Sequence, residues 1–158
     1  MPRPPYTGGC QCGAVRYAYS VEPSRRSVCH CRMCQKALGN VFAPFAGGPP
    51  ETFRWTRGAP KIFHSSAVGE RGFCGDCGTP LTYRDTRDPR TFVTIGSFDN
   101  PNALAPTVHV GMQGCVAWLD TLGKLPGGVT EPDPLQASRQ HPDHDTDAWS
   151  PPPLNPSR

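Results

Sequence analysis

The chain has 158 residues, which suits one domain or one domain followed by a tail. Hydrophobic residues make up a lean 36% of it, while 17 glycines and 20 prolines favour turns over long regular elements. No apolar run reaches the length needed to cross a membrane. A net charge of +3 is too small for the dense basic stripe of a nucleic-acid binder. We therefore expect a soluble protein with neither a membrane nor a nucleic acid as its partner.

Short strands dominate the predicted secondary structure. From Val15 to Val21 apolar side chains alternate with others, which is the period of a half-buried strand. Pro44 indicates that its strand is an edge strand or carries a bulge. Glycine and proline mark nearly every junction between these segments. The predicted fold class is mainly β, with a short helix at 33–38 and further strands at 41–45, 52–56, 61–64, 80–84, 91–96, 107–110 and 115–119.

The composition changes near residue 127. Residues 126–158 hold eight prolines and few apolar anchors, so this segment cannot bury enough surface to offset its chain entropy. We expect one folded domain at 1–126 and a disordered or loosely packed tail at 127–158. A metal could bind weakly in this tail, but a solvated run is the favoured interpretation of His141, Asp143, His144 and Asp145.

Seven of the eight cysteines form three tight clusters: an N-terminal pair (Cys10 and Cys12), a triplet (Cys29, Cys31 and Cys34) and a knuckle pair (Cys74 and Cys77). Disulfides are disfavoured because cysteines one residue apart pair poorly, and because no apolar stretch near Met1 could act as a secretory signal. The expected compartment is the reducing cytoplasm. Closely spaced thiolates are typical zinc ligands. Seven ligands predict two zinc ions per chain, one with four sulfurs and one with three sulfurs and the open position of a catalytic zinc.

The clusters can be combined in two ways. A zinc ribbon would join the last two cysteines of the triplet to the knuckle pair and would leave the other three without a role. The alternative joins the N-terminal pair to the knuckle pair and leaves the triplet as a self-contained site. Local spacing favours this alternative, because the triplet can surround one ion at little cost in loop closure.

Three motifs then resemble one family: GCQCGAVRY at 9–17, CHCRMCQK at 29–36 and FCGDCGTPL at 73–81. The chain is similar there to the glutathione-dependent formaldehyde-activating enzymes, also called the centromere protein V family. Segments 95–101 and 109–118 look like later parts of the family, so the resemblance covers roughly residues 8–126. It implies an Mss4-like fold of antiparallel sheets. It also implies a structural zinc on the N-terminal and knuckle pairs, and a second zinc, able to be catalytic, on the triplet.

The resemblance further implies a carbon–sulfur lyase or synthase that joins a low-molecular-weight thiol, such as glutathione, to formaldehyde or a related small aldehyde. The alternative is a non-catalytic zinc module that binds a protein or a small thiol, because this fold also hosts binding proteins. No residue is carried over as a glutathione contact. A solvated basic face is favoured over a carboxylate site for the four cations around the triplet: Arg25, Arg26, Arg32 and Lys36.

The remaining cysteine and the histidines favour structural roles. Cys115 lies outside the family pattern and is expected to be a buried, inert thiol. A fourth ligand from Cys115 would instead close the second zinc site and weaken the enzyme hypothesis. His30 should point away from the metal and serve at the surface or in a hydrogen bond. His64 and His109 are expected to be structural.

Overall fold

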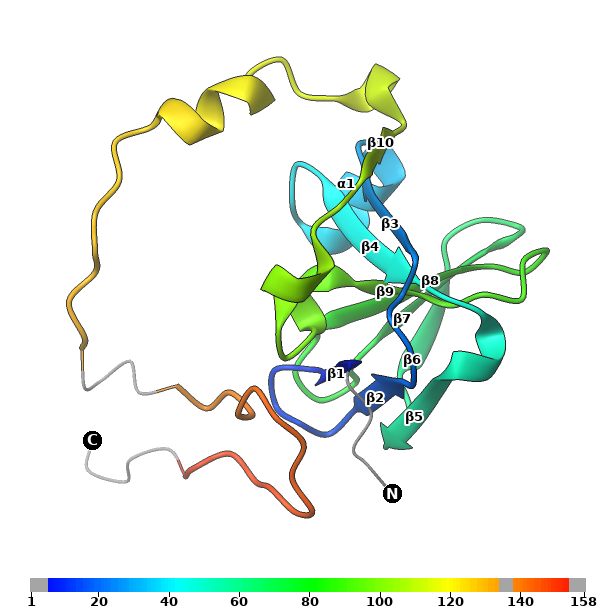
Figure 1. Ribbon diagram of the computed structural model, residues 1–158, viewed down its shortest axis with the longest axis vertical. Coiled ribbons are helices and arrows are strands. Elements are labelled where there is room, and N and C mark those ends of the chain that lie inside the picture. Colours follow the sequence, from blue (N-terminus) through cyan, green and yellow to red (C-terminus); the bar gives the residue numbers. More distant parts are fainter. Residues whose placement is uncertain (1–5, 134–137, 154–158) are drawn as a thin grey trace.

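The computed structural model describes residues 6–133 and 138–153, and two β-sheets organise them (Figure 1). The smaller sheet has three antiparallel strands in the order β1 (Tyr6–Gly9), β2 (Arg16–Tyr19) and β5 (Phe53–Arg57). In the larger sheet all neighbours are antiparallel except β10 and β3, which run parallel. Its order is β10 (Val108–Val110), β3 (Arg25–Cys29), β4 (Ala43–Gly47), β9 (Phe92–Thr94), β8 (Pro80–Asp85), β7 (Gly69–Phe73) and β6 (Lys61–His64). The fold is mainly β, as predicted.

Helices are short. The α-helix α1 (Arg32–Leu38) confirms the predicted helix; Cys31 caps its start, and Gly39 ends it at a φ of 61°, a conformation that glycine adopts without strain. No helix in the described ranges is long and apolar enough to span a membrane. The remaining helical segments are 3₁₀ turns: η1 (Pro50–Thr52), η2 (Ile95–Ser97), η3 (Pro101–Leu104), η4 (Met112–Gly114) and η5 (Leu119–Lys124).

Two hydrophobic clusters anchor the cysteines. In the larger one Tyr17 and Tyr19 are fully buried, and their hydroxyls bond to the Ser97 hydroxyl and the Thr91 carbonyl. Buried tyrosine hydroxyls need hydrogen-bond partners, and both tyrosines of this apolar core have one. Cysteines from the N-terminal and knuckle pairs belong to this cluster, whereas a triplet cysteine belongs to the smaller one. The larger cluster buries Cys10 and Cys74, and the smaller cluster consists of Cys34, Ala43 and Phe45 as its buried members.

Most of the predicted strands are present. The strand at 61–64 is β6, and the other predictions from 15–21 to 107–110 each contain or overlap a strand of the structure. The prediction at 115–119 is wrong. There the backbone makes successive turns, with the Leu119 N–H donating to the Val116 carbonyl, and then enters η5. Trp118 is 49% exposed, so the segment has no buried face to hold it in a sheet.

The prediction for Pro44 is also wrong, because β4 is an interior strand paired with both β3 and β9. Pro44 lies opposite Val28 of β3, but the register with β9 begins only at Phe45. The proline therefore sits where β4 has one neighbour, so its missing N–H interrupts no ladder on the β9 side.

The part of the tail from His141 to Trp149 lies beside the loop between β1 and β2, whereas residues 127–133 are exposed and run apart from both sheets (Figure 1). His141 is only 3% exposed, so the expectation of a solvated run is wrong at this residue. Arg16 is paired with Asp145 at 2.6 Å as well as with Asp99. The division of the chain at residue 126 stays a prediction, as do the Mss4-like assignment and the compartment.

Candidate metal centres

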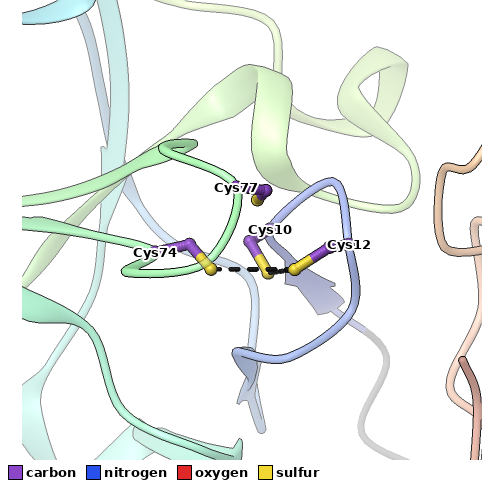
Figure 2. Close-up of side chains that lie close together, drawn as sticks. All are labelled: Cys10, Cys12, Cys74 and Cys77. Atoms are coloured by element: carbon purple, nitrogen blue, oxygen red, sulfur yellow. Dashed lines mark hydrogen bonds between the residues drawn. The ribbon is translucent and has the colours of Figure 1, made fainter. Parts of the chain in front are cut away.

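The structure gathers the N-terminal and knuckle pairs into one four-cysteine group whose sulfurs all lie within 4.8 Å of one another (Figure 2). The Cys12 sulfur is 3.6 Å from that of Cys10 and 3.8 Å from that of Cys74. Zn–S bonds of about 2.3 Å place two sulfurs of a tetrahedral site about 3.8 Å apart. A disulfide would hold them at about 2.05 Å, and every cysteine is free. The donor set therefore fits zinc.

Two loops present these four sulfurs. The loop between β1 and β2 turns at Gly13, where φ is 75°, and the Val15 N–H donates to the Cys10 sulfur at 3.2 Å. The loop between β7 and β8 turns at Gly78, where φ is 77°, and the Asp76 N–H donates to the Cys74 sulfur. Such N–H donors stabilise thiolates, and a cysteine that binds a cation must be a thiolate.

Thr79 joins the two loops. Its hydroxyl oxygen accepts a hydrogen bond from the Gln11 N–H at 3.0 Å and lies 3.1 Å from the Cys77 sulfur. Burial alone would raise the pKa of Cys77, but hydrogen bonds from Thr79 and others lower it to about 6. Burial raises the pKa of both Cys10 and Cys12. These hydrogen bonds favour the thiolate form of Cys77, and cysteines that bind a metal do so as thiolates.

The triplet forms a second, three-cysteine group within 4.8 Å. Cys29 ends β3, Cys31 is the N-cap of α1 and accepts a hydrogen bond from the Cys34 N–H at 3.4 Å, and Cys34 lies in the first turn of the helix. A strand end followed by a helix start bends the chain enough to aim all three sulfurs at one point. No fourth Cys, His, Asp or Glu ligand joins them within the described ranges.

A cavity of about 510 Å³ opens beside the three-cysteine group, lined in part by Phe45, Tyr83 and Phe92. Cys12 and Cys77 also border a surface cavity, but their group already supplies four sulfurs. Space beside an incomplete ligand set can admit a substrate, whereas space beside a complete one cannot offer it a coordination position. The three-cysteine group is therefore the candidate reaction site.

Arg71 is the residue of this site that sequence reasoning missed. It comes from the middle of β7, is 7% exposed and donates from Nη2 to the Cys34 sulfur at 3.3 Å. Burial raises the pKa of Cys34 to about 12 even though Arg71 acts in the opposite direction. Its surroundings in sequence, Gly-Glu-Arg-Gly, carry no sign of burial or of a partner.

The other candidates lie nearby or apart. Arg25 and Arg26 line the cavity beside the triplet, while Arg32 and Lys36 line a second cavity of about 680 Å³. Cys115 does not join the three-cysteine group; its thiol contacts the Val116 carbonyl, 3.6 Å away.

The histidines divide between the core and the surface. His30 is fully buried, with its Nε2 2.8 Å from Nδ1 of His109. The predicted hydrogen-bonding role of His30 is confirmed, and a surface position for it is excluded. His64 is 73% exposed and lies 3.8 Å from Glu70.

The fold and these sites define a class: small, mainly β proteins with two cysteine groups that could hold metal ions. The family model of the glutathione-dependent formaldehyde-activating enzyme matches residues 5–113. The chain belongs to that family.

Two relatives carry informative names. An "Uncharacterized lyase" of Schizosaccharomyces pombe is 31% identical over 83 residues, which are 52% of this chain and 60% of the yeast protein. A "Putative glutathione-dependent formaldehyde-activating enzyme" of Halomonas elongata is 29% identical over 124 residues, 72% of this chain and 78% of its own. A Rhodobacter sphaeroides protein has a similar crystal structure, with a TM-score of 0.52 and 21% identity over 66% of this chain and 99% of the other; it supports the fold alone.

Proposed function

We propose that the chain is a zinc-dependent carbon–sulfur lyase or synthase that joins a low-molecular-weight thiol to formaldehyde or a related small aldehyde. The observation that carries the proposal is the three-cysteine group, which has no fourth ligand in the described residues and opens onto a 510 Å³ cavity. Membership of the family and the names of the two relatives support the same class of reaction.

The two groups would have different tasks. Cys10, Cys12, Cys74 and Cys77 would hold a structural zinc that ties the β1–β2 loop to the β7–β8 loop. Cys29, Cys31 and Cys34 would hold the second zinc. When bound there, the ion would supply thiol activation at its open position, since three thiolate donors leave it a weak Lewis acid.

The chemistry is balanced without an oxidant or a reductant. The thiol sulfur forms a bond to the aldehyde carbon as the π bond of the carbonyl breaks, and the proton of the thiol moves to the former carbonyl oxygen. The aromatic walls of the cavity would lie beside the reacting sulfur, and the Arg71 guanidinium would orient Cys34 through its hydrogen bond. Reversal of the same steps gives the lyase direction.

The test is formaldehyde consumption by the zinc-loaded protein with glutathione, compared with glutathione alone, because thiols add to formaldehyde without a catalyst. We expect an excess rate that Cys34→Ser abolishes while the four-cysteine group keeps its zinc. Cys115→Ala is the matched control, since Cys115 lies outside the group, and it should keep the excess rate. A wild type that binds two zinc ions but gives no excess rate would favour the alternative, a zinc module that binds a thiol or a protein.

A further inference from the structure

Arg71 lies between two cavities formed by the described residues. Its side chain lines both the 510 Å³ cavity that contains the triplet and the 680 Å³ cavity beside α1, β6 and β7. A charged side chain that is 7% exposed is unusual unless its charge is balanced and its donors are satisfied.

The donors of Arg71 are only partly used. Nη2 donates to the Cys34 sulfur, Nε donates to the Ser65 hydroxyl at 3.2 Å, and the guanidinium carbon lies 5.0 Å from the centre of the Tyr83 ring. Nη1 is buried and has no hydrogen-bond partner among the described residues. A buried N–H without a partner is costly, so a native structure that keeps one suggests a partner that comes from outside the chain.

No carboxylate of the described residues balances Arg71. Neither cavity is lined by an aspartate or a glutamate there, whereas both are lined by further cations. The neighbouring Glu70 is engaged by Arg84 at 2.9 Å. The Cys34 sulfur occupies Nη2 and leaves Nη1 without a partner among the described residues. A small anion that enters the cavity would give Nη1 a partner and balance the guanidinium charge.

We propose that Arg71 binds a carboxylate of the substrate through Nη1 and thereby selects thiols that carry an acidic group. The inference rests on the proposed function, because it places the carboxylate beside the group where the thiol would react. Guanidinium suits this task, since its planar N–H groups match carboxylate oxygens and it stays charged when buried. Arg71 would act as a specificity-determining residue.

The test is a binding measurement without aldehyde, so it can succeed or fail independently of the proposed reaction. Isothermal titration of the zinc-loaded full chain compares 3-mercaptopropionate with 3-mercapto-1-propanol, which differ in the acidic group. The wild type should bind the carboxylate at least about tenfold more tightly, the effect of one charge-assisted hydrogen bond. Arg71→Gln should remove this preference, so that it weakens binding of the carboxylate at least about tenfold more than binding of the alcohol.

Two further variants make the result decisive. Arg54→Gln removes the same charge from an exposed position of β5 that lines neither cavity, and it should keep the preference. Arg71→Lys keeps the charge but loses the planar fork, and it should retain only part of the preference. Zinc content and thermal melting establish that each variant is folded.

Two results would overturn the inference. The first is a wild type that binds both thiols equally well, which would overturn the inference whether or not any variant folds. An Arg71→Gln variant that weakens both thiols by the same factor would assign Arg71 to supporting Cys34 alone.

Discussion

The backbone N–H of His141 donates a hydrogen bond to the carbonyl oxygen of Gln11, across 2.7 Å. Gln11 lies between the two cysteines of the N-terminal pair, so the tail contacts the loop that presents half of the four-cysteine group. The His141 ring packs over Gly13, where an added Cβ would come within 2.4 Å of His141 Cδ2. The rings of Trp149 and His141 meet edge-on. The tail therefore supports the loop from outside.

Replacing His141 should destabilise the protein. His141→Ala removes a buried ring and leaves a gap over Gly13, so we expect a loss of about 1–3 kcal/mol in the free energy of unfolding. His144→Ala, at an exposed position three residues away, is the matched control and should change it by less than about 0.5 kcal/mol. Urea denaturation of the zinc-loaded protein measures both. Equal effects of the two variants would show that the tail contact contributes nothing specific.

The contribution of His141 should fall on acidification. Burial, with the nearby charge of Arg16, lowers the pKa of His141 below 6.5. The unfolded chain then binds more protons than the folded one as the pH falls below about 6.5, so stability decreases, by at most about 1.4 kcal/mol per pH unit.

His141→Ala cannot titrate and isolates this effect from that of the cysteines. The difference in unfolding free energy between wild type and variant should therefore shrink from pH 7.5 to pH 5.5. A difference that stays constant across this range would refute the assignment.

Serine substitutions should separate the two cysteine groups. Cys10→Ser and Cys77→Ser each break a connection between segments about 60 residues apart, and we expect losses above about 3 kcal/mol. Cys31→Ser should cost about 1–2 kcal/mol, because its group lies within one short segment and serine still caps α1. Thermal melts check the order. If Cys31→Ser proves the most damaging, the structural and catalytic roles must be exchanged.

Zinc content should follow the two groups. The reduced wild type should bind up to two zinc ions per chain, and Cys34→Ser should leave about one. Cys115→Ala should keep both, because its sulfur lies outside the three-cysteine group. Elemental analysis of protein dialysed against excess zinc provides the measurement. Loss of one ion from Cys115→Ala would mean that the second centre is closed.

The fold class was predictable because turn residues and alternation act locally. Two of the strands absent from the prediction show the limit of that signal. β7 reads Gly-Glu-Arg-Gly-Phe and β3 begins with two arginines, so neither looks apolar. Each is held by partners on both sides, and such pairing cannot be seen in the strand's own residues.

The candidate metal ligands were predictable for a related reason, since spacings of two and three residues are themselves local. Arg71 was not, because its contact with Cys34 joins residues 37 positions apart. His141 was misjudged because its polar neighbours indicate solvent, whereas its burial depends on the empty space above Gly13.

The two cysteine groups also differ in when they can form. A growing polypeptide completes the triplet as soon as Cys34 is made, whereas Cys12 meets Cys74 only after 62 further positions. The N-terminal thiols are thus exposed to oxidants while the residues between Cys12 and Cys74 are being made. Where zinc is scarce, we expect damage to begin at the earliest-made cysteines.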